Sequence, residues 1–460
     1  MPNKEIKDMK KKIMSEIEGF KESHRFEHDV FYQAVEEVLL SIVPLLVADE
    51  RYNVNTIVRR LVVPDRIIKF KVEWMDDQQK IQVNTGYRVQ FNNTLGPYKG
   101  GLRFHPTVNE GILKFLGFEQ IFKNALTGLP IGGAKGGSDF NPKGKSDFEV
   151  MKFCSSFMRE LHKYIGPRMD VPAGDIGVGG REIGYLFGEY KKITSTFDGV
   201  LTGKPNFFGG SLMRPQATGY GVVYFTEKML EVEGKETLEG KICAVSGAGN
   251  VALYTIEKLI ELGAIPVSCT DSKGTIYDAR GVDIELLKDL KFNRRASLEE
   301  YVKTHTEATY TPVAEYPEGG HAVWNIECHA AFPCATQNEL TETDANNLIK
   351  NGCISVSEGA NMPSTTEAIE VFLKNKICFA PAKAANAGGV AVSNFEMGQN
   401  AAMQRWSFEE VDTRLKETMR YICNSVSDTA KEYGVEGNYV DGANIAAFKK
   451  IADAMIAEGI

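Results

Sequence analysis

The sequence predicts an α/β protein with two or three domains. The chain has 460 residues, and its hydrophobic content of 43% and charged content of 25% are ordinary for a globular protein. Up to about residue 205, helical patterns are mixed with alternating strand patterns and glycine-rich segments. Beyond this point, short apolar strands alternate with helices, which predicts a parallel sheet covered by helices.

The elements of the first part follow from the spacing of its apolar residues. Residues 4–20 and 29–46 carry apolar side chains at helical spacing. Residues 67–72 and 80–91 are predicted strands, and the second alternates apolar and polar residues as a half-buried strand does. Further helices are predicted over residues 109–126, 147–165 and 180–193.

The second part repeats a strand–helix–strand unit. Residues 241–246 and 265–270 are predicted strands, with a helix over 250–262 between them. Residues 380–395, with their Asn-Ala-Gly-Gly turn, are predicted as a loop that leads into a long helix. Two more helices are predicted over 411–433 and 442–460, and the last is expected to pack back on the first domain.

A glycine-rich turn follows the strand over 241–246. Its residues, Gly247-Ala248-Gly249-Asn250-Val251-Ala252, form the GxGxxA pattern of a dinucleotide-binding turn. The first glycine allows the tight turn, the second lets a pyrophosphate approach, and the small last residue lets the helix pack on the strand. The helix N-terminus adds unpaired N–H groups and a partial positive charge. Because a second strand ends about 20 residues later, the segment predicts a Rossmann-type dinucleotide-binding domain.

The end of that second strand bears on the choice of dinucleotide. Asp271 could accept hydrogen bonds from a ribose 2′-hydroxyl, which would favour NAD. Ser272 and Lys273 could instead hold a 2′-phosphate, which would favour NADP, and Arg294 and Arg295 lie a little downstream. These residues alone leave NAD and NADP equally open.

Three lysines lie in or beside glycine-rich segments of the first part. Lys99 belongs to Gly-Pro-Tyr-Lys-Gly-Gly, Lys123 ends Phe-Glu-Gln-Ile-Phe-Lys, and Lys135 belongs to Gly-Gly-Ala-Lys-Gly-Gly. Ammonium groups that are brought together repel one another, so their gathering predicts a bound anion. A ligand with two carboxylates would satisfy two lysines. The third would keep a depressed pKa and could act as a neutral amine.

An acidic loop, Pro-Ala-Gly-Asp-Ile-Gly-Val-Gly, occupies residues 172–179. Its Asp175 could move protons to and from a nitrogen atom, while a neutral lysine activates water to attack an iminium carbon. Gln120 lies three positions before Lys123 and shares its helix face. Asp175 could also be a simple turn residue, and each lysine a surface charge. Four such residues in glycine-framed segments favour a catalytic site.

Composition argues against several other classes of protein. The net charge of −8 makes nucleic acid an unexpected partner, and no apolar run reaches membrane-spanning length. The eight cysteines are scattered without a CxxC pair, so we predict buried free thiols and no metal site. The N-terminal segment is rich in lysine and glutamate and lacks the apolar region of a secretory signal, so a cytoplasmic location is expected.

Seven segments together resemble one family. From about residue 30 to its C-terminus, the chain is similar to the hexameric, small-subunit glutamate dehydrogenases of bacteria and lower eukaryotes. The resemblance implies reversible oxidative deamination of L-glutamate to 2-oxoglutarate and ammonium, a reaction of amino-acid and nitrogen metabolism, by a homohexamer. It is carried by residues 86–91, 96–103, 129–137, 170–179, 214–221, 333–338 and 385–389.

The resemblance also implies how the chain is divided. Residues 1–205 would form an α/β substrate-binding and oligomerisation domain, with the C-terminal helix over 431–460 packing back on it. Residues 206–430 would form the Rossmann-type domain. The active site would lie in a cleft between the two.

The resemblance assigns roles to individual residues. Lys135 would be the catalytic lysine that activates water, and Asp175 would handle protons on the substrate nitrogen. Lys99 and Ser393 would hold the γ-carboxylate. The remaining substrate contacts would be Lys123 and Gln120 at the α-carboxylate and the backbone of Gly174 at the α-amino group. Cofactor contacts would include Thr218, Gly249, Asn250 and Asn386, to which the glycine-rich turn adds Gly247 and Val251.

Three alternatives stay open beside this interpretation. The Asp-Ser-Lys-Gly strand end is typical of NADP-dependent members, but Asp271 keeps NAD or dual use possible. A leucine, valine or phenylalanine dehydrogenase would share the catalytic lysine and aspartate, although Lys99 and Ser393 would then lack a partner. A non-catalytic NADP-binding protein would need the glycine-rich turn but neither Lys135 nor Asp175. Residues 318–329 are less typical of the family.

Overall fold

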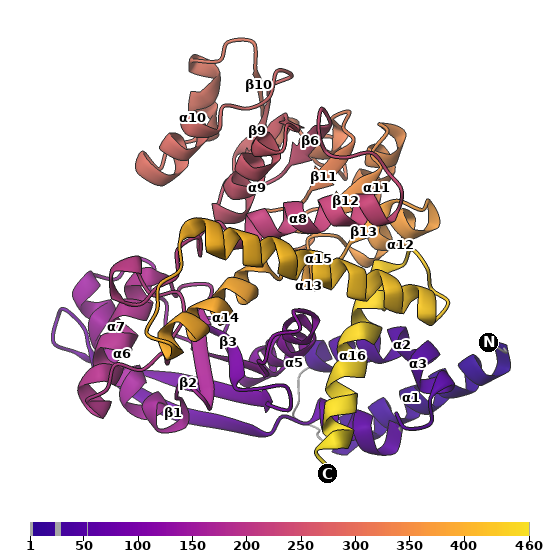
Figure 1. Cartoon of the computed structure of the whole chain (residues 1–460). Helices are drawn as coiled ribbons and strands as arrows, with labels where there is room; N and C mark the ends of the chain where they lie inside the picture. The colour runs from indigo at the N-terminus through magenta and orange to yellow at the C-terminus, as the bar shows by residue number, and fades with distance from the viewer. Residues whose placement is uncertain (1–2, 24–28, 53, 460) are drawn as a thin grey trace. The chain divides into compact units, whose positions relative to one another are not determined.

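The computed structural model describes residues 3–23, 29–52 and 54–459, so residues 1, 2, 24–28, 53 and 460 of the predicted ranges lie outside it (Figure 1). The chain divides into two compact units. Unit 1 comprises the chain up to Arg214 together with 392–411 and 444–460, and unit 2 comprises 215–391 and 412–443. Three helices contribute residues to both units: α14 (Gly388–Ala401), α15 (Phe408–Glu432) and α16 (Tyr439–Ala457).

Unit 1 is built on a mixed five-stranded sheet with the strand order β1-β2-β4-β3-β5. The β1–β2 and β2–β4 pairs are antiparallel, whereas β3 pairs in parallel with β4 and with β5. Lys99 on β3 and Lys135 on β4 therefore lie on neighbouring strands. The strands are β1 (Arg66–Met75), β2 (Ile81–Asn92), β3 (Tyr98–Phe104), β4 (Gly133–Ser138) and β5 (Asp170–Gly174).

The apolar patterns predict β1 and β2 but miss β3, β4 and β5, because the missed strands are rich in glycine. Close packing of neighbouring backbones explains this composition. A Cβ atom on Gly100 would lie 1.6 Å from the carbonyl oxygen of Ala134, and one on Gly137 would lie 2.0 Å from that of Arg103. No side chain can be accommodated at either position.

Two long helices of unit 1 begin at residues whose side chains cap them. α5 (Glu110–Leu126) follows Asn109, whose side chain accepts a hydrogen bond from the backbone N–H of Ile112. α6 (Asp147–Leu161) begins with a capping box between Ser146 and Glu149. Together with α7 (Gly180–Thr194), α6 buries an aromatic cluster against the sheet, composed of Phe104, Phe140, Phe153 and Phe157.

The N-terminal helices differ in one respect from the prediction. α1 (Asn3–Ser23) agrees with the predicted helix, but the single helix predicted over 29–46 is wrong. α2 (Asp29–Ser41) ends, and α3 (Val43–Ala48) begins anew with Pro44 in its first turn. Proline has no N–H to donate, so it begins a helix far better than it continues one. A short helix, α4 (Arg59–Val62), precedes β1.

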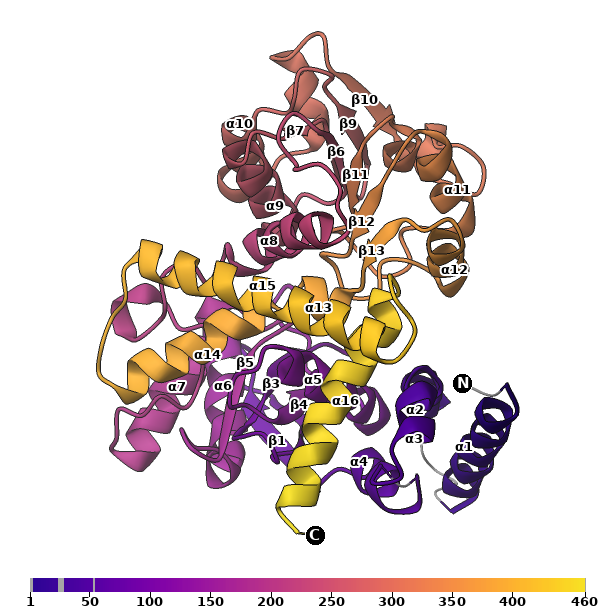
Figure 2. The same ribbon diagram turned by 45° about the vertical axis from the view of Figure 1, so that its right-hand side comes forward.

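Unit 2 contains a parallel five-stranded sheet with the order β13-β12-β11-β6-β7. Helices α8 (Ala217–Val232) and α9 (Asn250–Glu261) lie on one side of it, and α11 (Glu342–Lys350) and α12 (Thr366–Lys374) on the other (Figure 2). This arrangement confirms the predicted parallel sheet covered by helices. The strands are β6 (Ile242–Val245), β7 (Ile265–Pro266), β11 (Ala330–Phe332), β12 (Ser355–Ser357) and β13 (Cys378–Ala380).

The strand predicted over 265–270 is divided between two sheets at Val267. Its first part is β7, and its second part, β8 (Ser268–Asp271), pairs with β9 (Gly274–Tyr277). β9 pairs in turn with β10 (Thr309–Pro312), which completes an antiparallel three-stranded sheet. A short helix, α10 (Ile284–Lys288), follows β9.

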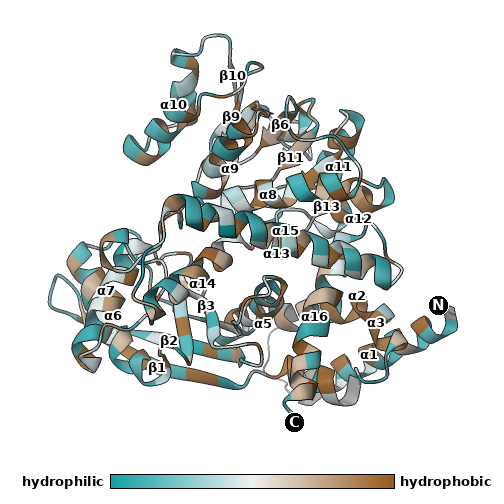
Figure 3. Cartoon of the chain, viewed as in Figure 1, coloured by the Kyte–Doolittle hydropathy of each residue, from teal (hydrophilic) through white to brown (hydrophobic). Residues whose placement is uncertain are grey.

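The segment after β13 is more helical than predicted. α13 (Ala382–Ala385) and α14 replace the expected loop, and α14 begins at Gly388 itself. A Cβ atom on Gly388 would lie 2.1 Å from the carbonyl oxygen of Ala217, so glycine is required where α14 begins against α8. Farther on, α15 has an apolar face along an otherwise polar surface (Figure 3). Its buried residues include Val411, Leu415, Met419, Ile422 and Val426.

The cysteines agree with the prediction: all eight are buried and none forms a disulfide. No helix in the described part of the chain is long and apolar enough to cross a membrane.

Candidate active site

Lys99 lies on β3 with its side chain fully buried. Its Nζ donates a hydrogen bond of 2.7 Å to Oγ1 of Thr202, which is buried as well. Burial lowers the pKa of Lys99 to about 7, although the charge of Glu396 acts in the opposite direction. A buried ammonium group that donates to a neutral hydroxyl would be stabilised further by an anion.

Lys135 on β4 and Asp175, which directly follows β5, form an ion pair. Lys135 Nζ lies 3.0 Å from Asp175 Oδ2, and Arg103 Nε donates to the same oxygen at 2.8 Å. Burial lowers the pKa of Lys135, while the charge of Asp175 opposes this shift. Burial would raise the pKa of Asp175, but the charges of Lys135 and Arg103 outweigh it and hold that pKa below its usual value. The pair therefore joins an ionised carboxylate to an amine that loses its proton easily.

Lys123 and Gln120 lie together on α5, as predicted. Burial, together with repulsion by the Lys135 charge, lowers the pKa of Lys123 to about 8. Lys123 and Lys135 are thus close enough to repel each other. Gln120 Nε2 donates to Asn124 Oδ1 at 2.7 Å, and Asn124 Nδ2 donates to the backbone oxygen of Lys99 at 3.1 Å. These bonds tie α5 to the strand that carries Lys99.

Ser393 is buried in unit 1, and Arg214 is half-buried there. The spacing of residues in the sequence does not single out Arg214 as a site residue. Arg214 Nε is buried and has no hydrogen-bond partner in the described part of the chain. Burial also lowers the pKa of this guanidinium. A guanidinium with an unused N–H is a candidate ligand for a carboxylate. Ser393 is buried within α14, so it is not a helix cap.

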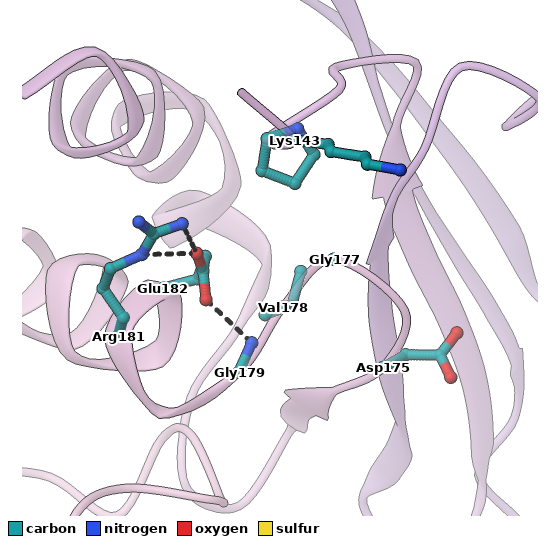
Figure 4. Close-up of a pocket in the computed structure, with 8 residues that line it drawn as sticks. Lys143, Asp175, Gly177, Val178, Gly179, Arg181 and Glu182 are labelled. Atoms are coloured by element: carbon teal, nitrogen blue, oxygen red, sulfur yellow. Dashed lines mark hydrogen bonds and ion pairs between the residues drawn. The ribbon is translucent and has the colours of Figure 1, made fainter. Parts of the chain in front are cut away.

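The loop that carries Asp175 folds tightly at the end of β5. A Cβ atom on Gly174 would lie 2.5 Å from the carbonyl oxygen of Val178, and Val178 N donates to Asp175 O at 2.9 Å. A hollow of about 440 Å³ borders this loop, and in Figure 4 the Asp175 carboxylate points away from the Arg181–Glu182 pair. The hollow is lined by Pro142, Lys143, Asp175, Gly177, Val178, Gly179, Arg181 and Glu182, so the three site lysines are not part of it.

In unit 2, the glycine-rich turn joins β6 to α9 as predicted. Gly247 has a φ of +88°, and its N–H donates to Thr270 Oγ1 at 2.7 Å. A Cβ atom on Gly249 would have no atom within 4 Å, so space is open in front of the helix N-terminus. Asn250 and Val251 form the first turn of α9 behind that space. These features fit the close approach of a pyrophosphate.

Asp271 at the end of β8 is engaged by the protein itself. Its Oδ2 lies 3.0 Å from Lys291 Nζ, and its Oδ1 accepts the backbone N–H of Lys273 at 2.9 Å. Ser272 and Lys273 are exposed beside it, whereas Arg294 pairs with carboxylates of its own neighbourhood. The ion pair between Asp271 and Lys291 was not predicted, because the two residues belong to separate elements of the fold.

Asn386 and Thr218 are the other predicted cofactor contacts of unit 2. Asn386 Nδ2 donates to the backbone oxygens of Gly359 and Ala360 at 3.2 and 3.1 Å. Its Oδ1 is buried and finds no partner within the described ranges, so it could accept a hydrogen bond from a ligand. Thr218 lies half-buried in the first turn of α8. Among the residues that the structure describes, no group of three histidine, cysteine or acidic side chains could hold a metal ion.

Comparisons with known proteins point to one family of dehydrogenases. Residues 209–459 match the family model of Glutamate/Leucine/Phenylalanine/Valine dehydrogenase, and residues 64–192 match that of the Glu/Leu/Phe/Val dehydrogenase dimerisation domain. The chain is 59% identical to an NADP-specific glutamate dehydrogenase of Helicobacter pylori, over 94% of this chain and 96% of the relative. It is 54% identical to an NAD(P)-specific glutamate dehydrogenase of Xylanibacter ruminicola, over 94% and 96%. The crystal structure of Plasmodium falciparum glutamate dehydrogenase matches with a TM-score of 0.93 and 47% identity, over 99% of this chain and 95% of that one.

Proposed function

The chain belongs to the Glu/Leu/Phe/Val dehydrogenase family, and we infer that it is an NADP-dependent glutamate dehydrogenase. In the oxidative direction, L-glutamate, NADP⁺ and water give 2-oxoglutarate, ammonium, NADPH and a proton. The reaction is reversible.

The observation that carries this function is the excess of buried positive charge in unit 1. Lys99, Lys123 and Arg214 are desolvated cations, and burial lowers the pKa of each of them. A substrate with two carboxylates would neutralise such a cluster. We propose that Lys99, Ser393 and Arg214 hold the γ-carboxylate. Lys123 and Gln120 would hold the α-carboxylate.

This charge distribution also supports glutamate over an apolar amino acid. A substrate with an apolar side chain would leave Lys99 and Ser393 without a partner in a buried pocket. Sites of this kind reject an analogue that lacks the partner group by about 10,000-fold. The leucine, valine and phenylalanine alternatives are therefore disfavoured.

The remaining amine and carboxylate would carry out the proton transfers. Asp175, held ionised by Arg103, accepts a proton from the α-amino group while the backbone at Gly174 faces that group. NADP⁺ supplies the hydride acceptor. Lys135, as a neutral amine, takes a proton from the water that adds to the iminium carbon. Lys135 then passes its proton to solvent. Asp175 returns its proton to the nitrogen, Lys135 takes the proton of the added hydroxyl, and the carbon–nitrogen bond breaks to leave the ketone and ammonia.

The preference for NADP is supported by the strand end in unit 2. Because Lys291 and two backbone N–H groups engage the Asp271 carboxylate, this group is not free to accept from a ribose 2′-hydroxyl. Ser272 and Lys273 present a hydroxyl and an ammonium group to solvent, and these would contact a 2′-phosphate. Gly247, Gly249, Asn250 and Val251 would receive the pyrophosphate, with Thr218 and Asn386 as further contacts.

We also propose that the enzyme is a homohexamer in the cytoplasm. The match to a dimerisation domain supports self-association of unit 1, and the eight free thiols suit a reducing compartment. Unit 1, with its cation cluster, would be the substrate-binding and oligomerisation domain, and unit 2 the Rossmann-type domain.

Initial rates on the purified protein would test this function. Glutamate, norvaline and leucine would each be measured against NADP and NAD. We expect glutamate with NADP to give the highest kcat/KM, and a higher value with leucine would overturn the assignment. The double variant Lys99→Leu with Ser393→Val should shift preference toward apolar amino acids. Unchanged substrate ratios would move the γ-carboxylate site elsewhere.

A further inference from the structure

A buried carboxylate one turn beyond Ser393 takes no part in the reaction described above. Glu396 lies in α14 with no exposed surface. Its Oε2 accepts the backbone N–H of Gly203 at 2.9 Å, and its Oε1 accepts that of Lys204 at 3.3 Å. Lys204 Nζ, whose side chain is also fully buried, lies 2.8 Å from the same Oε1. One carboxylate thus receives two backbone N–H groups and an ammonium group.

The backbone that Glu396 holds is the backbone that presents Thr202 to Lys99. Thr202 N donates to the backbone oxygen of Pro172 on β5 at 3.0 Å, which fixes one side of this segment to the sheet. Glu396 fixes the other side to α14. Thr202 Oγ1 then meets Lys99 Nζ at 2.7 Å. Ser393 and Glu396 are three positions apart on α14, so they share a helix face.

Neighbouring contacts extend the attachment of α14 to this segment. Gln399 Nε2 donates to Ser211 Oγ at 2.9 Å, and Asn400 Nδ2 donates to the backbone oxygen of Gly209 at 2.7 Å. Arg214 follows at the end of the same segment. The position of α14 relative to residues 201–214 therefore affects where Thr202 and Arg214 lie relative to Lys99.

Glu396 also faces the cations of this pocket electrostatically. Its charge raises the pKa values of Lys99 and of Arg214, against the lowering caused by burial. The other charged groups that act on Lys99 are Arg88 and Arg214, which lower its pKa, and Asp170, which raises it. Arg88 and Asp170 pair with each other at 2.5 Å, and Glu396 pairs with Lys204 at 2.8 Å, so each carboxylate acts on Lys99 from within an ion pair.

We propose that Glu396 is a positioning residue that holds Thr202 and Ser393 around Lys99 and thereby sets the preference for a substrate with a second carboxylate. This role rests on the proposed glutamate dehydrogenase activity. If the Lys204–Glu396 pair only stabilised the fold, its loss would lower the activity with all substrates equally.

Two variants of the full-length protein separate these roles. Glu396→Gln removes the charge and leaves Lys204 buried without its partner, which can destabilise the fold. Lys204→Met with Glu396→Gln removes both charges and avoids that cost, so it replaces the single variant if the latter is not folded. Glu189→Gln is the matched control, because Glu189 is a buried carboxylate of unit 1 that pairs with Arg159 instead. Thermal unfolding and NADPH binding confirm that each protein is intact.

The readout compares L-glutamate with norvaline, which has the same carbon chain but no γ-carboxylate. We expect KM for glutamate to rise about 30-fold in Glu396→Gln, with kcat within about threefold, because the substitution displaces groups that hold the bound γ-carboxylate. For norvaline, kcat/KM should change less than about threefold. Equal losses for the two substrates, or no loss for either, would overturn the positioning role.

The pH dependence of KM for glutamate is a further test, because a purely structural role of Glu396 would leave it unchanged. Without the Glu396 charge, Lys99 loses its proton at a lower pH, so the rise of the glutamate KM with pH should begin earlier in Glu396→Gln than in the wild type. An unchanged profile would count against the proposal. Failure of the proposed function would show differently, as a wild-type enzyme that does not prefer glutamate to norvaline.

Discussion

The cations of unit 1 are buried, whereas the cations at the strand end of unit 2 are exposed. Lys99 and Lys135 lie almost fully out of solvent on adjacent strands. Lys273, which follows β8, is exposed, and 20% of the Lys291 side-chain surface is accessible to solvent. Both regions would bind anions. Desolvation lowers the pKa values of the buried cations in unit 1, whereas dissolved salt screens the charges of the exposed cations in unit 2.

The same residue type thus serves two purposes in one chain. A buried ammonium group without enough negative charge around it either binds an anion or gives up its proton, and either outcome is useful to a deaminating enzyme. An exposed ammonium group keeps its proton and acts as a fixed point charge for a phosphate. Five experiments test this contrast.

Removing Lys135 is the strongest test. Lys135→Ala should lower kcat by about 1,000-fold, because the amine that activates water is lost. NADPH affinity should change less than about twofold, since the proposed cofactor contacts belong to unit 2. Steady-state kinetics and NADPH fluorescence titration measure the two effects. The surface variant Lys163→Ala is the control, and a kcat within about tenfold of wild type would refute the assigned role.

The carboxylate partner comes next in expected effect. Asp175→Asn should lower kcat by about 100-fold with little change in glutamate affinity, because the proton acceptor is removed while the carboxylate ligands remain. The amine of Lys135 would also lose the charge that raises its pKa. Asp147→Asn, at an exposed carboxylate, serves as the control. Activity within about tenfold of wild type would argue that protons reach the substrate nitrogen by another route.

The exposed region should respond to cofactor identity. Ser272→Ala with Lys273→Ala should weaken NADPH binding about 30-fold and NADH binding less than about threefold, because only NADPH carries the 2′-phosphate. Binding is measured by fluorescence titration with each cofactor. Equal losses for the two cofactors would rule out a phosphate contact at these residues.

A change of pH should alter the binding of a dicarboxylate to the buried lysines of unit 1. Lys99 with a pKa of about 7 and Lys123 with a pKa of about 8 carry their charges only below those values. A dicarboxylate binds the charged forms, so its affinity should fall as pH rises through this window. For glutarate as a competitive inhibitor, we expect Ki to rise about tenfold per pH unit between the two pKa values and about a hundredfold per pH unit above the higher one, because binding then requires two protons. A Ki that stays constant from pH 6.5 to about pH 9 would contradict the depressed pKa values.

Ionic strength should give the smallest and most selective effect. Raising the salt from about 0.05 to 0.3 M should weaken NADPH binding severalfold, because the proposed phosphate site is exposed. Glutarate binding should weaken less, because its cations are buried. Potassium chloride titrations at constant pH measure both. A larger effect on glutarate would reverse the contrast between the two regions.

The sequence predicted the second unit better than the first. The parallel sheet and the turn at Gly247 follow from apolar strands and a glycine pattern that local rules describe. β3, β4 and β5 were not predicted, because their glycines interrupt the alternation of apolar and polar residues by which strands are identified. In β3 and β4, the same glycines flank Lys99 and Lys135. The helix break at Pro44 was readable in principle from the proline itself.

The sequence singles out candidate site residues only where neighbours in sequence carry the proposed chemistry. Lys135 and Asp175 stand out in their glycine-rich segments. Arg103 and Glu396 do not, because an arginine in a strand and a glutamate in a helix look ordinary until the fold places them against charged partners. Lys291 was missed for the same reason, since its pair with Asp271 depends on how the segment after α10 returns to β8.

The glycines of β3 and β4 limit how this enzyme can be evolved in the laboratory. With carbonyl oxygens 1.6 to 2.0 Å from where a Cβ atom would stand at Gly100 and Gly137, substitution there should yield mainly insoluble protein. Randomised libraries that seek new amino-acid specificities should leave these glycines of β3 and β4 unchanged. Diversity is better placed on the face of α14 that meets the pocket, where side chains can change without separating two backbones.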